Sequence, residues 1–447
     1  MAGDAEFSTD GARSPEPVAF WQRSLKNEAQ KNQVIDHCRG LSGGTLKAIA
    51  KLVGGRFLAD RNLNRLALHS ALQQMAWGLL NGFSAVFLLR QGLPVSKIFL
   101  CFSGIIALRC AIRPAVLASV RGIGLRSTLI LGTSLYAAQG PLLASVHGID
   151  FALFGYCLVA AVAQAFYWTS YHAIFAALGE SDDRGSQVGW RELLIALAGA
   201  AGPAAGGIML TFSGPWAAFG AAALVEVFAV LPLKGVIEPK IALAAAPGAY
   251  SLYRRGIVLL GTDGWIFNIS GWAWSLIMFQ ALRARYDTFG GSLALLALVG
   301  AASGLLFGRL IDLGHARRAT VINALTLSAT LVAKAVCGID ALSVLAVALS
   351  TAALGGLYVP SLMTAIYNEA KASACPFRFH FAAEMGWDIG GIFACLAASA
   401  LCAFGVSLQT LILLALPIVA LQAFVLDDSY AERKTAVAAP GTELPGR

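Results

Sequence analysis

Charged residues are scarce in this chain, and their scarcity limits the class of protein it can be. Of 447 residues, 13% are charged and 57% are hydrophobic, and the mean hydropathy is +0.69. Soluble globular domains carry about 25% charged residues. The composition therefore excludes an ordinary soluble domain and predicts a membrane protein.

Several chemical signatures are also missing from the sequence. The eight cysteines form no Cys-x-x-Cys pair, so we interpret them as small core residues. The sequence has no nucleotide-binding loop, metal-ligand cluster or nucleophile-base arrangement. We therefore expect no enzyme, no primary pump, no metal and no other cofactor.

Long apolar runs are the main feature that the sequence does have. About 20 helical residues cross a hydrocarbon core of about 30 Å, and runs of that length recur between residues 66 and 427. They predict an all-α integral membrane fold with twelve transmembrane helices. The predicted spans are 66–89, 94–113, 126–146, 151–178, 187–213, 215–234, 256–281, 291–311, 318–338, 341–368, 378–404 and 406–426.

The distribution of Lys and Arg predicts the orientation of these spans. With both termini in the cytoplasm, fourteen basic residues flank the spans on the inner side, and the outer loops hold only Arg90, Lys97, Arg283 and Arg285. This asymmetry follows the positive-inside rule. The net charge of +8 is then mainly a cytoplasmic-face property, so we expect no nucleic-acid partner. Richness in Ala, Gly and Arg favours a multi-pass protein of a bacterial inner membrane.

The two halves of the chain repeat with one period. A shift of 192 residues brings Arg126 onto Arg318 and Glu192 onto Glu384, and each span keeps its direction. Parallel repeats of this kind occur in transporters whose halves rock about a central site. The predicted parts are a cytoplasmic tail at 1–65 with a candidate amphipathic membrane-surface segment, a six-helix bundle at 66–234, a cytoplasmic linker at 235–255, a second six-helix bundle at 256–427 and a disordered tail at 428–447.

Two short motifs add a family resemblance. The loop "GRLIDLGHARR" (308–318) combines Gly, Asp and a basic pair, although Val120 stands where the first half would repeat Asp312, and "GPAAGG" (202–207) lies in the fifth span. With the repeat, these motifs make the chain resemble the major facilitator superfamily, in no identified subfamily. The resemblance implies two pseudo-symmetric bundles, with span 2 against span 11 and span 5 against span 8. GPAAGG is similar to a motif of antiporters in that family, and its small residues also allow close helix packing.

The same resemblance implies that spans 1, 4, 7 and 10 line a central cavity, and these spans do carry polar and aromatic residues at helical spacing. Amides beside aromatic rings suit a mid-sized organic solute. An alternative for single aromatic residues is packing at the membrane interface. The candidate cavity residues are Gln73, Trp77, Asn81, Gln164, Trp168, Tyr171, Trp265, Asn268, Trp272, Tyr358, Ser361, Tyr367 and Asn368.

Two acidic residues within the spans are candidates for proton coupling. An ionised side chain at mid-membrane costs about 2.5–3.5 kcal/mol on insertion scales. Asp263 and Asp388 therefore need a partner, water or a proton, and burial favours their protonated form. The alternative for each is a fixed hydrogen bond to a neighbouring helix. Glu226 in span 6 has no assigned role.

Glu384 lies one helical turn before Asp388, and we assign it to a gate. Span 2 carries Arg109 and Arg113 at a comparable depth, so an ion pair with Glu384 would close the cytoplasmic side. The repeat supplies a counterpart set, and the remaining gate candidates are Arg191, Glu192, Arg309, Asp312, Arg317 and Arg318. As an alternative, Arg109 binds an anionic substrate.

The sequence thus predicts a monomeric secondary transporter of a small organic solute, in contact with membrane lipids and coupled to protons. The antiporter-like motif favours export. Proton-coupled uptake by symport is the alternative of the same class, and a transporter-like lipid flippase or sensor is the alternative of a different class.

Overall fold

The computed structural model describes residues 61–178, 184–239, 249–312, 316–373 and 375–438. Within these ranges the chain forms helices and no β-strand. The candidate surface segment in the N-terminal tail and residues 439–447 lie outside the described part. The first half comprises α4 (Arg61–Arg90), α5 (Val95–Ile123), α6 (Leu125–Ala144), α7 (Phe151–Leu178), α8 (Arg184–Phe212) and α9 (Gly214–Leu233).

In the second half, several helices are interrupted by short turns of another helical type. The elements are α10 (Ala249–Ile266), the π-helical turn η1 (Phe267–Gly271), α11 (Trp272–Ala281), α12 (Tyr286–Asp312), α13 (Ala316–Val336), α14 (Ala341–Leu354), the 3₁₀ turn η2 (Gly355–Leu357), α15 (Tyr358–Ala372), α16 (Pro376–Ala403), α17 (Leu408–Ile412), the 3₁₀ turn η3 (Leu413–Ala415) and α18 (Leu416–Ala438).

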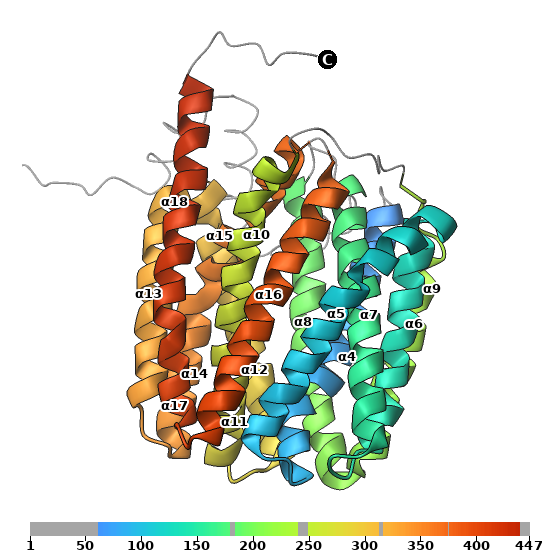
Figure 1. Ribbon diagram of the computed structural model, residues 1–447, viewed down its shortest axis with the longest axis vertical. Coiled ribbons are helices and arrows are strands. Elements are labelled where there is room, and N and C mark those ends of the chain that lie inside the picture. The colour runs from blue at the N-terminus through green and yellow to red at the C-terminus, as the bar shows by residue number, and fades with distance from the viewer. Residues whose placement is uncertain (1–60, 179–183, 240–248, 313–315, 374, 439–447) are drawn as a thin grey trace, which may run out of the picture. The chain divides into compact units, whose positions relative to one another are not determined.

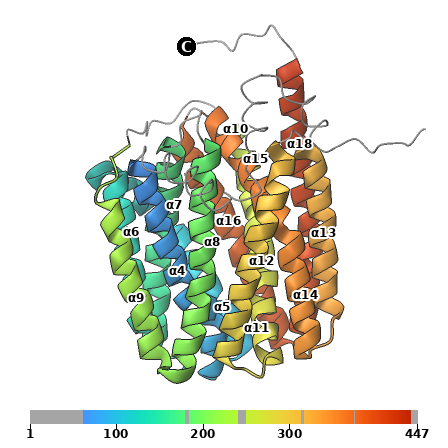
Figure 2. The same cartoon turned by 180° about the vertical axis from the view of Figure 1, so that it is seen from behind.

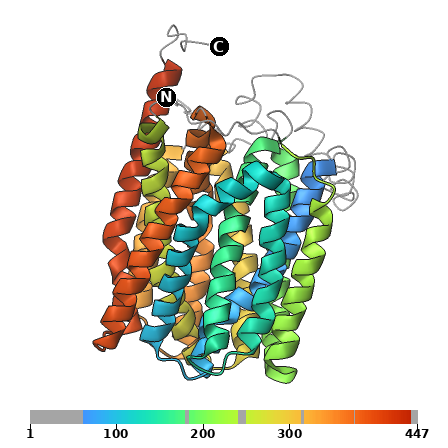
Figure 3. The same ribbon diagram turned by 45° about the vertical axis from the view of Figure 1, so that its right-hand side comes forward.

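Every predicted span overlaps one or more helices, and eight helices in the described ranges are long and apolar enough to cross a membrane. The largest differences from the predicted boundaries are at the C-terminal ends of two helices. Helix α5 continues past Arg113 to Ile123, so its arginines lie well inside the helix. Helix α18 continues to Ala438, into the segment expected to be a disordered tail, and extends past its neighbours in Figures 1 and 3.

The interruptions have local causes that hydropathy alone does not reveal. In η1 the Asn268 side chain donates to the carbonyl of Gly264 at 2.8 Å, which is the acceptor of the regular helical bond. Pro360 follows η2 and Pro417 follows η3, and a proline ring disrupts the bond to the carbonyl four residues earlier.

Helices α4 to α9 lie together on one side of residues 60–447, and α13, α14, α15 and α18 lie on the other (Figures 1 and 2). Between them α5 packs against α16, and α8 packs against α12. These are the two pairings that the resemblance implied. The pair α5 and α16 carries the charged residues described below.

Glycines on α8 allow the close packing that the GPAAGG motif predicts. A Cβ atom on Gly202 would lie 2.5 Å from the Met75 carbonyl oxygen of α4, and one on Gly206 would lie 2.7 Å from the Phe83 ring. A Cβ on Gly207 would meet the Tyr286 backbone at the start of α12. Helix α8 is therefore in close contact with both halves.

Candidate functional site

Asp388 of α16 is bonded by two arginines of α5. The Arg109 Nε donates to Oδ1 at 2.6 Å, and the Arg113 Nε donates to Oδ2 at 2.9 Å. Each guanidinium also makes a closer contact with the same carboxylate through Nη2. Asp388 is fully buried, and Arg109 and Arg113 are 3% and 1% exposed. One carboxylate thus bridges two buried cations across the contact of the two halves.

The two arginines also form hydrogen bonds with side chains of α7, and one of them contacts a tryptophan ring. The Arg109 Nη1 donates to the Gln164 Oε1 at 3.0 Å, and the Arg113 Nη1 donates to the Thr169 Oγ1 at 2.8 Å. The Arg109 guanidinium also lies 4.5 Å from the centre of the Trp387 ring, a cation-π distance. Three helices therefore hold the guanidinium groups in fixed positions.

Glu384 is at the edge of this cluster, where it faces α5 and α7. Its Oε2 lies 3.8 Å from the Arg113 Nη1, and its Oε1 lies 3.6 Å from the His172 Nε2. The His172 ring stacks on the His380 ring with centroids 5.7 Å apart, and the Tyr367 hydroxyl lies 3.4 Å from the His172 Nδ1. Two carboxylates thus accompany two guanidinium groups, and the imidazoles connect the cluster to α15.

This arrangement corrects the expected pairing of the acids. The prediction placed both arginines against Glu384, whereas the structure bonds both to Asp388, and Glu384 approaches only Arg113. The reason is depth: α5 continues past Arg113, so its arginines reach the level of Asp388, which is one turn further along α16.

Asp263 of α10 forms a second polar cluster with α15 and α16. The Tyr358 hydroxyl donates to Oδ1 at 2.5 Å, and the Trp387 Nε1 donates to Oδ2 at 2.9 Å. The Gln422 amide of α18 lies 3.4 Å from the Tyr358 hydroxyl. Since the Trp387 ring also lies against Arg109, which bonds Asp388, a single side chain connects the half-buried Asp263 with the buried Asp388 cluster.

The other candidate cavity residues divide into several environments. Trp168 stacks on His172 and contacts Trp77 edge to face. The Tyr171 hydroxyl bonds with the Ser70 hydroxyl at 2.9 Å. The Trp272 indole donates to Asn268 at 3.1 Å, and the ring stacks on Phe102 of the first half.

Three more of these candidates lie in the second half. The Trp265 Nε1 donates to the Leu414 carbonyl at 3.2 Å, toward η3. Ser361 is buried with its hydroxyl unpaired, and Tyr430 bonds its carbonyl at 2.9 Å. Asn368 is half-buried in α15, two helical turns before Cys375.

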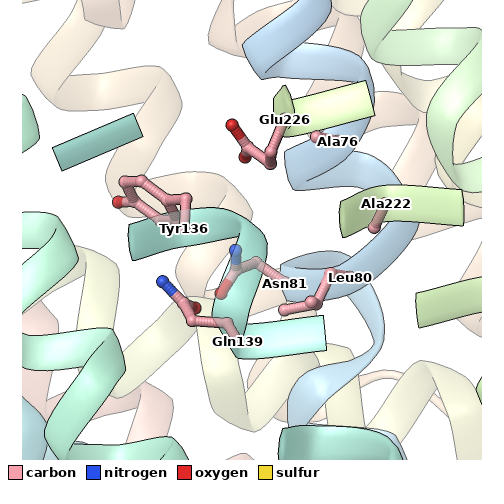
Figure 4. A pocket seen from close by; sticks show the side chains of 7 residues that line it. All are labelled: Ala76, Leu80, Asn81, Tyr136, Gln139, Ala222 and Glu226. Atoms are coloured by element: carbon pink, nitrogen blue, oxygen red, sulfur yellow. The ribbon is translucent and has the colours of Figure 1, made fainter. Parts of the chain in front are cut away.

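Asn81 lines a separate polar pocket within the first half, and Gln73 bonds to Glu226, which also lines it. The Gln73 Nε2 donates to the Glu226 Oε1 at 2.9 Å. Ala76, Leu80, Asn81, Tyr136, Gln139, Ala222 and Glu226 line the pocket, between α4, α6 and α9 (Figure 4). Glu226 is 4% exposed and points into the first half.

The counterpart gate lies largely outside the described side chains. Arg191 and Glu192 fall in α8, and Arg309, Asp312 and Arg317 fall in or beside α12 and α13, but their side chains are not among those described. Arg318 is exposed at the beginning of α13. The roles of these residues stay predictions.

Several participants of the site were not among the sequence candidates, and Thr169, Trp387 and Gln139 are three that have a signal in the sequence. Thr169 is one residue after Trp168 on the polar α7, and Trp387 stands between Glu384 and Asp388. Gln139 is an isolated amide within an apolar span. None of these signals identifies a partner, because the partner depends on how the helices are rotated.

Comparison with known proteins assigns the fold. No protein-family model and no curated protein matches the sequence. Among solved structures, the human organic anion transporter MFSD10 has a TM-score of 0.61 at 16% identity, covering 82% of this chain and 99% of that one. An auto-inhibited POT family peptide transporter has a TM-score of 0.60 at 14% identity, covering 84% and 97%. The nucleoside transporter NupG has a TM-score of 0.58 at 15% identity, covering 82% and 98%.

These three structures are all described as transporters and none as an enzyme. At these identities the likeness concerns the fold, and this chain shares the fold of these three transporters.

Proposed function

We propose that this chain is a secondary active transporter that moves a small organic solute across a bacterial inner membrane by alternating access. In this proposal all twelve predicted spans cross the membrane as two six-helix bundles, both termini are cytoplasmic, and the protein works as a monomer. Solute transport is coupled to protons, and the antiporter-like motif favours export.

One observation carries the proposal: the Asp388 carboxylate joins Arg109 and Arg113 across the contact between α5 and α16. A buried ion pair is a weak source of net stability, because desolvation of its charges offsets their attraction. It is better suited to distinguish two arrangements, since it exists only while α5 and α16 are in contact. Breaking and reforming it is what alternate opening of two bundles requires.

The side chains around the cluster support an organic solute. Trp77, Trp168 and Tyr367 offer aromatic faces, and Gln164 offers an amide near Arg109. The similar transporters take organic anions, peptides and nucleosides, which have polar groups joined to apolar or ring surfaces. An anionic group on the solute would compete with Asp388 for Arg109, which gives the arginine a role in binding as well as in closure.

A proteoliposome assay tests the proposal. Purified protein is reconstituted with an internal pH dye, and a panel of sugars, organic acids, amino acids, amphipathic cations and aromatic compounds is applied under imposed pH gradients. Antiport predicts proton movement opposite to the solute, and symport predicts movement in the same direction. If solute accumulates to the same level with and without an imposed pH gradient, this result would contradict proton coupling.

The lipid alternative predicts a different outcome. If the protein flips or senses a lipid, removal of residues 1–58 should abolish function while membrane insertion is retained. A transporter of the proposed kind keeps solute transport after this removal. Movement of a fluorescent lipid between leaflets, measured in the same proteoliposomes, gives the direct comparison.

A further inference from the structure

The carboxyl group of Glu226 is buried with half of its hydrogen-bonding capacity unused. Gln73 donates to Oε1 at 2.9 Å, whereas Oε2 is buried and has no hydrogen-bond partner. The side chain extends from α9 into the space between α4 and α6 (Figure 4). If Glu226 were ionised, one of its two buried oxygens would accept no hydrogen bond.

The facing side chains of α6 are also without hydrogen-bond partners. Both amide atoms of Gln139 and the hydroxyl of Tyr136 are buried and unpaired. Gln139 is fully buried and Tyr136 is 3% exposed, and both line the pocket with Glu226 and Asn81. Buried polar groups nearly always have partners, so this group of unpaired atoms indicates a ligand that the side chains share.

The charges around the pocket limit what that ligand can be. Among the described side chains, α4 contributes His69, whose Nδ1 lies 2.9 Å from the Ala229 carbonyl oxygen, and α6 contributes Tyr136. The stretch of α8 from Leu194 to Phe212 contributes no titratable group. Arg109 is bonded to Asp388 instead. No described cation balances a negative charge on Glu226, and an isolated buried carboxylate is strongly disfavoured.

The size of the pocket discriminates between the candidate ligands. The space between the side chains is too narrow for a water molecule. A solute group or a hydrated cation would require the helices to separate, whereas a proton needs no additional volume. A protonated carboxyl is also neutral, so it needs no cation beside it, and its unpaired oxygen then carries the O–H group.

We propose that Glu226 is a proton-binding site enclosed in the first half of the chain, with its carboxyl O–H directed into the pocket of Asn81, Tyr136 and Gln139. The site extends the proposed proton coupling to a third carboxyl group, in a helix that the family resemblance does not place on the cavity. Gln73 connects it to α4, which also carries Trp77 and Asn81. Release of the proton requires water to enter between α4 and α9, so it accompanies a change in their packing.

Infrared difference spectroscopy of the purified protein tests this site without any solute. At neutral pH the wild type is expected to show the C=O stretch of a protonated carboxyl group that Glu226→Gln lacks. Glu369→Gln is the matched control, because Glu369 is half-buried and lies 3.9 Å from Arg255. The band should persist in this control. Identical bands in wild type and Glu226→Gln would overturn the assignment.

A second variant tests the pocket and does not depend on the folding of Glu226→Gln. Gln139→Leu makes the pocket less polar while keeping the carboxyl group, so the band should shift to higher wavenumber. An unshifted band would contradict the placement of the carboxyl group in this pocket. Repeating the wild-type spectrum in sodium and in choline salts distinguishes a metal cation: loss of the band only in sodium would replace the proton by that ion. Because solute is absent throughout, failure of the site and failure of the transport proposal remain distinguishable.

Discussion

The Asp388 carboxylate of α16 bridges Arg109 and Arg113 of α5, two residues one helical turn apart on the same face. Without the carboxylate, two like charges would remain close together in a buried site. Asp388 therefore has two effects, since it joins the halves and balances charge within α5. This dual role distinguishes it from Glu384, which approaches Arg113 at 3.8 Å.

Replacement of Asp388 by Asn should strongly destabilise the protein. Removing one partner of a buried ion pair typically costs about 3–5 kcal/mol, because an uncompensated charge stays buried. We expect a lower midpoint of thermal unfolding in detergent for Asp388→Asn. The double variant Asp388→Asn/Arg113→Gln should recover part of the lost stability, because it removes one of the two arginine charges that lack a counter-ion in the single variant. Equal losses for the single and the double variant would contradict the bridging role.

The positions of the helices could be predicted from the sequence because hydropathy reports burial in lipid directly. Predicted span 151–178 coincides with α7 (Phe151–Leu178), and the small residues of GPAAGG lie at close contacts as expected. Helix interruptions were not predictable in the same way. The π-helical turn at Phe267–Gly271 contains side-chain hydrogen bonds of Asn268 and Ser270 to backbone carbonyls, and an average over a window contains no such local contact.

The sequence also could not predict which acidic residue of α16 bonds to the arginines of α5. Glu384 and Asp388 are four residues apart and so share a face, and periodicity cannot say which one reaches the arginines. The answer depends on the relative depth of α5 and α16, which the continuation of α5 to Ile123 changes. Glu226 is a similar case, since its orientation depends on the rotation of α9 and not on its position in the sequence.

Glu384→Gln should loosen the contact between α5 and α16 on the side that the proposed topology makes cytoplasmic. The neutral amide loses the attraction to Arg113 and to a protonated His172, so the closed arrangement becomes less favoured. Cys375 is a natural reporter, because it is buried directly before α16. We expect severalfold faster alkylation of Cys375, followed by peptide mass spectrometry in inside-out vesicles. The same substitution at Glu369 should leave the rate unchanged, and an unchanged rate in Glu384→Gln would argue against a gate.

Asp263→Asn should abolish solute accumulation driven by a pH gradient while sparing solute exchange. Asparagine cannot bind or release a proton in this pH range, so it cannot couple. Tyr358 and Trp387 donate to different oxygens of this carboxylate, and the NH2 group of asparagine cannot accept from the donor whose oxygen it replaces. Tyr358→Phe is the informative companion, since it removes one donor and keeps the titratable group. Accumulation should be retained in Tyr358→Phe, with an altered pH dependence. If Asp263→Asn still concentrates solute, Asp263 is a structural hydrogen-bond acceptor and not a coupling residue.

Gly202→Ala should destabilise the contact between α8 and α4, because the added Cβ would lie 2.5 Å from the Met75 carbonyl oxygen. Overpacking of this kind typically costs about 1–3 kcal/mol. Gly220→Ala is the matched control: no atom lies within 4 Å of its added Cβ, and it is also helical, in α9. Alanine has the higher helix propensity, by up to about 1 kcal/mol, so Gly220→Ala should leave the thermal midpoint unchanged or raise it. Since both variants add the same methyl group, a lower midpoint confined to Gly202→Ala would assign the loss to the α8–α4 contact, whereas equal midpoints would show that α4 can move away at little cost.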